Sequence, residues 1–256
     1  MSQRMPALFL GHGSPMNALE DNTYTQTWAE LGRRFPAPKA ILMISAHWMT
    51  NTTAVTAMEQ PKTIHDFGGF PPALYAMQYP APGNPALAQR VAALLAPETV
   101  VLDHSWGLDH GAWSLLVKVY PQANIPVVQL SLNLNQDAQY HYALGQQLSA
   151  LRDEGIMLMA SGNVVHNLRH LHPQIRAYDW AERFDQAVKN KIEQGDFEAL
   201  IHFEKMGMDA RLSIPTTEHY LPLLYILGAK RDDDQLEVLC EDLAMGSISM
   251  TSYLFN

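Results

Sequence analysis

The chain has 256 residues, 47% of them hydrophobic and 17% charged, which is enough apolar material to bury a substantial core. Its formal net charge of −9 argues against a nucleic-acid partner, and no apolar run approaches the roughly 18 to 20 residues that cross a bilayer, so we expect no membrane association. The single cysteine, Cys240, excludes an internal disulfide and a thiolate-based structural zinc site, and the amino-terminal segment shows no signal-peptide core, so we expect a cytoplasmic protein.

The first 50 residues contain two apolar runs of strand length, and each delivers a histidine. Residues 7–10 lead into His12, which stands between two glycines, and residues 40–49 carry His47 near their carboxyl end. Between them, residues 23–35 have helical spacing. Both histidines are therefore predicted to lie at the carboxyl edge of one sheet.

A long segment at 60–85 interrupts this pattern. Glycine and proline predict a loop, and its aromatic residues favour an ordered, functional wall over disorder. The remaining strands are predicted at 53–58, 98–102, 126–132, 156–160, 236–239 and 247–255, and the remaining helices at 85–96, 111–120, 137–153, 179–194, 197–203 and 216–227.

Strands that alternate with helices at this spacing indicate an α/β fold with a central, mostly parallel or mixed sheet flanked by helices. We see no linker and no internal repeat, so we expect a single catalytic domain over residues 1–256. The charged helical segment at 179–210 could still pack as a separate appendage.

Six of the eleven histidines lie at predicted strand ends or at the start of a helix: His12, His47, His104, His110, His166 and His219. Independent structural histidines have no reason to recur at such positions. A metal site, by contrast, needs ligands from distant segments that converge on one sheet edge. The set therefore predicts a metal site at the carboxyl edge of the strands.

The donor type restricts the metal without identifying it. Imidazoles without thiolates suit Fe(II), Zn, Cu or Ni, in a non-haem iron oxygenase or in a zinc hydrolase that uses a metal-bound hydroxide. The hydrolase would need a general base, for which Glu218 is the obvious candidate. A non-enzymatic metal-binding or sensing module would explain the histidines but not the long aromatic loop, which can form the wall of a pocket for an apolar ring.

Several other polar residues lie outside the predicted metal site. His65, in the aromatic loop, is a candidate for lining a substrate pocket, and Asp103 and Asp109 either orient His104 and His110 or cap the following turn. Four histidines on or beside charged helices are interpreted as surface residues: His141, His170, His172 and His202.

Five motifs together carry a family resemblance: FLGHGSP around His12, ISAHW around His47, LDHGAW around His110, SGNVVHN around His166 and PTTEHYLPL around His219. With them the chain resembles, over essentially its whole length, the class III extradiol ring-cleavage dioxygenases of the LigB-like superfamily. It is most similar to the 4,5-DOPA extradiol dioxygenase branch.

The resemblance implies a mononuclear Fe(II) site at which a catechol such as L-DOPA and O₂ react, with 4,5-cleavage to a seco-DOPA type product. It implies metal ligation by His12 and His47, an acid/base role for His166 with a pKa near neutrality, and substrate contact with a catalytic role for His110. His65 is expected to contact substrate as well. No partner is expected beyond the small-molecule catechol and O₂, in a monomer or small homo-oligomer.

The third ligand is where this chain departs from part of the superfamily. Some relatives use a glutamate, whereas the motif here reads Glu218-His219, and the resemblance to the DOPA-type branch favours His219. Three neutral imidazoles leave the full charge on the metal and would also accept zinc, with His166 as a fourth ligand in a zinc-bound resting form.

Overall fold

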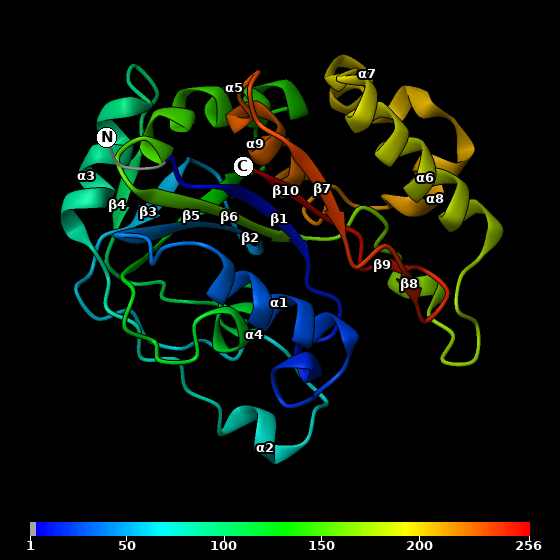
Figure 1. The fold of residues 1–256 in the computed structure, drawn as a ribbon, viewed down its shortest axis with the longest axis horizontal. Helices are drawn as coiled ribbons and strands as arrows, with labels where there is room; N and C mark the ends of the chain where they lie inside the picture. The colour runs from blue at the N-terminus through cyan, green and yellow to red at the C-terminus, as the bar shows by residue number, and fades with distance from the viewer. Residues whose placement is uncertain (1–3) are drawn as a thin grey trace.

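An eight-stranded mixed sheet forms the centre of the computed structural model, which describes residues 4–256 (Figure 1). The strand order is β4-β3-β5-β2-β6-β1-β10-β7. The four central strands run parallel and are β5 (Val127–Asn133), β2 (Ala40–Thr50), β6 (Ile156–Gly162) and β1 (Ala7–Gly11). The predicted α/β class with a mixed sheet is confirmed.

Shorter strands complete the sheet on both sides of this parallel centre. On one side, β3 (Ala54–Thr56) pairs antiparallel with β5 and parallel with β4 (Val101–Asp103). On the other, β10 (Ser252–Phe255) lies antiparallel between β1 and β7 (Leu236–Leu239). A separate antiparallel pair consists of β8 (Leu243–Ala244) and β9 (Ile248–Ser249).

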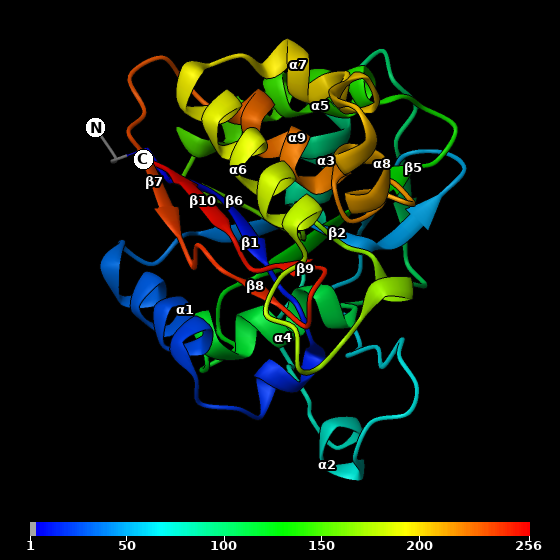
Figure 2. The same ribbon diagram turned by 90° about the vertical axis from the view of Figure 1, so that its right-hand side faces the viewer.

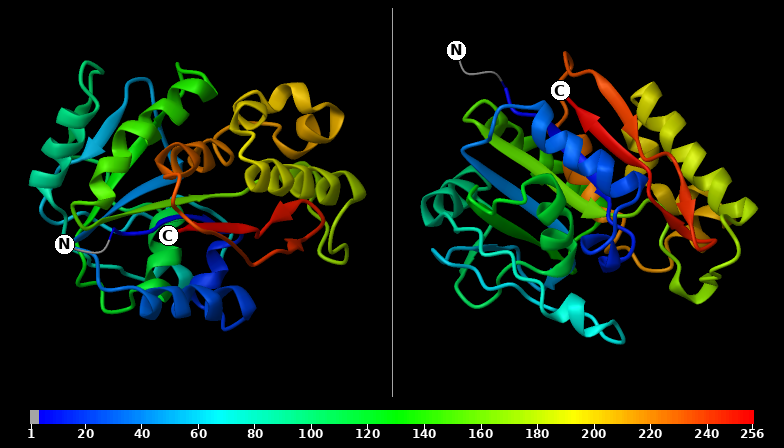
Figure 3. Two further views of the ribbon diagram at one scale, coloured as in Figure 1. Left: turned by 45° about the horizontal axis from the view of Figure 1, so that its top comes forward. Right: turned by 60° about the horizontal axis from the view of Figure 1, so that its bottom comes forward.

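Helices cover both faces of the sheet, which explains why its central strands are apolar on both sides. In β1, Phe9 packs with one core cluster and Leu8 with the other, and Leu42 and Met43 alternate in the same way in β2. The views in Figures 1 and 3 show the two helical layers. One layer contains α3 (Pro85–Leu94), α5 (Ala138–Leu148) and α9 (Leu221–Ala229), and the other α1 (Thr23–Arg34) and α4 (His110–Val119).

The helical segment after the loop that follows β6 lies at one end of the fold, beside β8 and β9 (Figure 2). It contains α6 (Asp179–Gln194), α7 (Phe197–Ile201) and α8 (Met208–Ser213). Phe184 and Val188 of α6 are buried in the same core cluster as α9 and the sheet. This segment therefore shares the main core and does not pack separately.

Several elements differ in extent from their predicted bounds. The strand predicted from residue 98 begins at Val101, and the helix predicted from residue 216 begins at Leu221, because residues 215–220 form a turn that carries Glu218 and His219. The long loop contains one short helix, α2 (Pro72–Tyr75), which projects from the body of the fold (Figures 1 and 2). Short 3-10 helices lie at Pro15–Ala18, Ser149–Arg152, Leu168–His170 and Phe203–Met206.

Helix ends follow the capping rules where the sequence supplied a cap. The side chains of Asn84 and Asp137 accept hydrogen bonds from the first turns of α3 and α5, and Asn22 forms a capping box with Thr25 at the start of α1. Within residues 4–256, no helix combines the length and the hydrophobicity needed to cross a bilayer.

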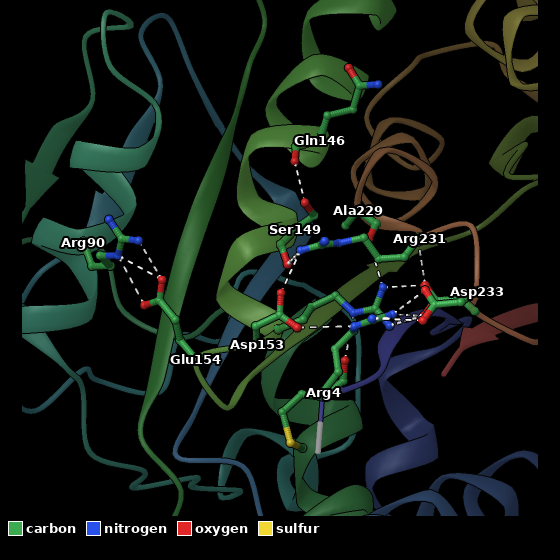
Figure 4. A network of polar contacts seen from close by, with 12 residues as sticks. Arg4, Arg90, Gln146, Ser149, Asp153, Glu154, Ala229, Arg231 and Asp233 are labelled. Atoms are coloured by element: carbon green, nitrogen blue, oxygen red, sulfur yellow. Dashed lines mark hydrogen bonds and ion pairs between the residues drawn. The ribbon is translucent and has the colours of Figure 1, made fainter. Parts of the chain in front are cut away.

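A buried ion pair fastens the amino edge of the central strands. Arg152, only 1% exposed, binds both carboxylate oxygens of Asp234 and donates to the carbonyls of Met5, Ala229 and Phe255. Figure 4 shows the more exposed charges around it, where Arg4 contacts Asp153 and Asp233 and Arg231 contacts Asp153. This network joins both ends of the described chain on the edge opposite the histidines.

Candidate active site

Histidines from five separate segments line one cavity of about 270 Å³ at the carboxyl edge of the sheet: His12 after β1, His47 in β2, His110 at the start of α4, His166 after β6 and His219 before α9. This is where the sequence predicted a metal site. Of the six histidines in that prediction, His104 does not join the others, because its side chain is exposed on the turn after β4.

A distortion of β2 places His47. Between the pairs Ile44 with Leu130 and Met49 with Leu132, β2 advances five residues while β5 advances two. The extra residues bulge out of the sheet, and a bulge of this kind re-aims a side chain at the end of a strand. His47 is thus turned toward His12, near the carboxyl end of the strand where the sequence predicted it.

Two glycines allow the segments that carry histidines to approach closely. A Cβ on Gly162, at the end of β6, would collide with the carbonyl oxygen of His219. A Cβ on Gly111 would overlap the Ser45 hydroxyl and lie 2.8 Å from Cδ2 of His47. Both positions therefore require a residue without a side chain.

His12 and His47 have the separation expected of two ligands to one ion. Their Nε2 atoms lie 3.2 Å apart. Two nitrogens bound to one ion at about 2.1 Å are about 2.9 to 3.4 Å apart for angles between about 90° and 109°. The pair therefore fits a metal without rearrangement.

His219 supplies a third nitrogen that has no hydrogen-bond partner within residues 4–256. This atom, Nε2, is buried, whereas Nδ1 of the same ring lies 3.1 Å from Oε1 of Glu218. Glu218 also accepts a hydrogen bond from the Thr216 hydroxyl, at 2.8 Å. A buried polar atom left without a partner is costly, and a metal ion would satisfy this one.

The rings of these three histidines form a nearly equilateral triangle. Ring centroids are 5.1 Å apart for His12 and His47, 5.3 Å for His12 and His219, and 5.0 Å for His47 and His219. Imidazoles that share one ion through a bond of about 2.1 Å have centroids about 4.5 to 5.3 Å apart. The three separations fall in this range.

The same cavity contains two further groupings of metal-binding side chains. The donor atoms of His12, His47 and His110 lie within 4.8 Å of one another, and so do those of His166, Glu218 and His219. Ring spacing distinguishes these sets from the triangle. The centroids of His47 and His110 are 3.8 Å apart, and those of His166 and His219 are stacked at 3.4 Å, too close for either pair to share one ion in this conformation.

A serine holds the far side of the His12 ring. Ser161 Oγ lies 2.9 Å from Nδ1 of His12. If Nδ1–H donates to this hydroxyl, Nε2 is left bare and faces His47. Metal-binding histidines commonly have such a partner on the other ring nitrogen, and the sequence alone did not identify Ser161.

Burial keeps these imidazoles neutral. Burial, reinforced by the neighbouring histidines, lowers the pKa of His12 and of His219 well below the ordinary value. Burial and His110 lower the pKa of His47 to about 3, and burial lowers that of His166 to about 4. Neutral imidazole is the form that binds metal, and the pKa of His166 is lower than the near-neutral value that the resemblance led us to expect.

Asp66, rather than Asp109, is the carboxylate in contact with the His110 ring. Oδ2 of Asp66 lies 2.9 Å from Nδ1 of His110, and Oδ1 accepts from the His110 backbone N–H at 2.8 Å. Asp109 caps α4 and accepts a hydrogen bond from the Ser45 hydroxyl at 2.6 Å. Asp103 accepts from the backbone of Ser105 and Trp106, so both aspartates that the sequence singled out are turn or cap residues.

Apolar side chains from three distant segments form the remaining walls of the cavity. Phe67 and Phe70 come from the long aromatic loop, which confirms that this loop forms a wall. The other two segments contribute Leu168 with Leu171 and Met245 with Ile248. His65 lies in contact with Phe67 and donates from Nε2 to the Met77 carbonyl, so the described residues that line the cavity do not include it.

One of the four histidines interpreted as surface residues is buried. His141 is fully buried between α5 and α9, with Nδ1 3.0 Å from the Tyr225 hydroxyl. The prediction of a surface position was wrong because His141 lies on the buried face of α5 with Leu144 and Leu148, whereas the exposed face carries Gln139, Gln146 and Gln147. His170 and His172 are exposed, as predicted.

Comparisons with known proteins place this chain among ring-opening dioxygenases. Residues 6–256 match the family described as the catalytic LigB subunit of aromatic ring-opening dioxygenase. A protein named 4,5-DOPA dioxygenase extradiol from Escherichia coli (strain K12) is 56% identical, over 98% of this chain and 94% of that protein. The protein of the same name from Beta vulgaris is 38% identical, over 96% of this chain and 95% of that protein.

A solved structure shares the fold as well. The crystal structure of an uncharacterized protein from Escherichia coli K12 superposes with a TM-score of 0.86 at 49% identity, covering 99% of this chain and all of that one. The family match extends over the strands, the histidine segments and the aromatic loop. The chain therefore belongs to the LigB family of catalytic subunits of aromatic ring-opening dioxygenases.

Proposed function

We propose that this protein is a metal-dependent extradiol dioxygenase that uses O₂ to cleave the ring of a catechol such as L-DOPA, at the 4,5 position. The names of the relatives support the reaction and the substrate class. The observation that carries the proposal is the triangle of three neutral imidazoles beside an apolar cavity.

A zinc hydrolase is not favoured. It would need a free carboxylate as general base near the metal, and Glu218 is the candidate that the sequence offered. The Glu218 carboxylate is instead engaged with Thr216 and with Nδ1 of His219. The family match also points to ring opening and not to hydrolysis.

His12, His47 and His219 are the residues proposed to hold the metal, with Fe(II) as the active ion. When bound, the ion would lower the catechol pKa and bring catechol and O₂ together. Glu218 then acts as the acceptor that orients His219 and not as the third ligand. The 3.1 Å contact on Nδ1 and the unpartnered Nε2 support this choice.

His166 and His110 are proposed to act on the substrate. Both line the cavity, and the neutral His166 can accept a proton from a catechol hydroxyl and later return it. His110, whose ring centroid lies 3.8 Å from that of His47, is proposed to contact the bound ring. Phe67 and the two leucines of the cavity lining offer apolar contact to that ring, and His65 packs edge-to-face against Phe67.

Zinc is proposed as a second metal that the isolated protein can hold, because a three-imidazole site suits it. His166 is the candidate fourth ligand in such a resting form. Its ring is stacked on His219 with an interplanar angle of 6°, so it would have to rotate away to bind the same ion.

For the cellular setting we propose a cytoplasmic enzyme that is a monomer or small homo-oligomer and acts without nucleic acid or membrane. The single cysteine and the net charge of −9 support this assignment.

The test is anaerobic reconstitution with Fe(II), followed by L-DOPA and air. The proposal expects O₂ uptake and a yellow ring-opened product in equal amounts. Simpler catechols without the amino-acid group serve as parallel substrates. If none of these catechols supports O₂ uptake by protein that holds a full equivalent of Fe(II), the proposed function is wrong.

A further inference from the structure

We propose that Asp66 is a positioning residue that fixes the tautomer of His110, holding the proton on Nδ1 and leaving Nε2 as the bare nitrogen. The inference rests on the proposed function, in which His110 contacts the substrate. Asp66 lies in the long aromatic loop, directly before the wall residue Phe67.

One carboxylate holds both the backbone and the ring of His110. Oδ1 of Asp66 accepts from the backbone N–H of His110 at 2.8 Å, and Oδ2 lies 2.9 Å from Nδ1 of the ring. The same Oδ2 lies 3.9 Å from Nδ1 of His47. The Asp66 side chain is 18% exposed and that of His110 is 7% exposed, so water screens this contact only in part.

The contact between Asp66 Oδ2 and His110 Nδ1 determines the tautomer, even though the ring N–H is not well aligned with the oxygen. Nδ1 of His110 is buried and has no well-aligned hydrogen-bond partner. An unprotonated Nδ1 would place a second acceptor atom 2.9 Å from a carboxylate oxygen, and two acceptors at that distance repel each other. A protonated Nδ1 turns the same contact into an attraction.

Asp109, which precedes His110 in the sequence, cannot fix the tautomer of the His110 ring. Asp109 is fully buried, and its carboxylate is occupied by the Ser45 hydroxyl, the Gln129 amide and the backbone N–H of Ala112. Among the described residues, Asp66 is the carboxylate that contacts the His110 ring.

The aromatic loop is anchored to the α4 segment without Asp66. Ile64 N–H donates to the Leu108 carbonyl at 2.7 Å, and Leu108 N–H donates to the Lys62 carbonyl at 2.8 Å. The Trp113 indole also donates to the Ile64 carbonyl, at 2.8 Å. A change at Asp66 should therefore alter the His110 contact while the loop and the Phe67 wall stay in place.

The substitution Asp66→Asn is the sharpest perturbation. Its amide oxygen can still accept from the backbone N–H of His110, but the amide NH₂ replaces the oxygen that faces Nδ1. A donor at that position favours an unprotonated Nδ1 and moves the ring proton to Nε2. Asp103→Asn is the matched control, because Asp103 also accepts backbone N–H groups in a turn but contacts no histidine of the cavity.

The first readout is the ¹⁵N resonance pattern of the His110 ring in metal-free protein, assigned with a His110→Gln variant. The proposal expects the Nδ1–H tautomer in the parent and in Asp103→Asn, and the Nε2–H tautomer in Asp66→Asn. Asp66→Glu, which keeps a carboxylate, should retain Nδ1–H. The same tautomer in the parent and in well-folded Asp66→Asn would overturn the proposal, as would the Nε2–H form in the parent.

The second readout is steady-state O₂ uptake by the Fe(II)-loaded protein. Asp66→Asn should lower kcat by about 10- to 100-fold, the usual cost of losing a residue that orients an active imidazole, with a much smaller change in KM. In a His110→Gln background, the same substitution should have no further effect. An equal loss in both backgrounds would show that Asp66 does not act through His110. If the parent itself consumes no O₂ with any catechol, the proposed function fails, while the ¹⁵N measurement still decides the tautomer.

Discussion

Replacing Glu218 by Gln and His219 by Ala should weaken metal binding by very different amounts. His219→Ala removes the buried Nε2 that has no hydrogen-bond partner among the described residues, and with it one corner of the imidazole triangle. Glu218→Gln keeps an amide oxygen that can still accept from Nδ1 of His219 and from the Thr216 hydroxyl. The two variants thus separate the ligand from the residue that orients it.

The expected magnitudes follow from these contacts. Loss of a residue that orients a metal-bound histidine typically costs 10- to 100-fold in metal affinity, or about 1.4 to 2.7 kcal/mol. The loss of metal affinity in Glu218→Gln should be near the lower end of this range, at about tenfold, because the amide oxygen is kept as an acceptor. His219→Ala should exceed the upper end of about 100-fold, because a ligand itself is lost.

Competition with a chromophoric chelator, checked by elemental analysis, measures both affinities. Glu198→Gln is a suitable control, because Glu198 makes a similar contact of 3.1 Å with His202 but both side chains are on the surface. This control should bind metal like the parent. Wild-type affinity in His219→Ala together with a loss above 100-fold in Glu218→Gln would refute the reasoning and make Glu218 the ligand.

Three further outcomes are expected. His166→Ala should retain a full equivalent of metal but lose about 10²- to 10⁴-fold in kcat, the usual contribution of an acid/base residue, and loss of metal from this variant would contradict the assignment. Asp234→Ala should lower the free energy of unfolding by about 3 to 5 kcal/mol in urea titrations, because it leaves the buried Arg152 unpaired. Loss of the exposed Arg90–Glu154 pair (Figure 4) should cost far less, and equal costs would contradict the stabilising role of the buried pair. Burial raises the pKa of Asp185 to about 6, although hydrogen bonds from Ser249 and Thr251 oppose this shift. The contribution of Asp185 to the free energy of unfolding is therefore greatest below about pH 4. It falls by about 3 kcal/mol as the pH rises through 6. Asp185→Asn should remove that part of the pH dependence, and an unchanged profile in urea titrations from pH 4 to 7 would show that this carboxyl is not the cause.

The sequence predicted those parts of the fold that depend on local patterns. The continuous apolar runs of β1 and β2 are typical of strands that are buried on both faces of a sheet. The convergence of His12 and His47 was also predictable, because the carboxyl ends of parallel strands meet at one sheet edge.

Features that depend on contacts between distant segments were not predictable. No spacing in the sequence indicated that Ser161 would face His12, or that Asp66 would contact His110 while the adjacent Asp109 turns into the core. The burial of His141 was missed for a related reason, since only the packing of α5 against α9 shows which face of that helix is inward. Such contacts are set by tertiary packing and not by local propensity.

The assignment of the third ligand shows the same limit. In the sequence Glu218 and His219 are adjacent, and either residue type can bind Fe(II) or zinc. The choice came from resemblance alone. The structure adds a physical reason for favouring His219, because its Nε2 is buried without a partner while Glu218 contacts the opposite side of the ring.

The position of the metal itself tests the central claim most directly. Anomalous diffraction at the iron edge, from crystals loaded with Fe(II) without oxygen, should show one peak about 2.0 to 2.2 Å from the Nε2 atoms of His12, His47 and His219. A peak bound by His110 in place of His219, or one held between His166 and Glu218, would contradict the account.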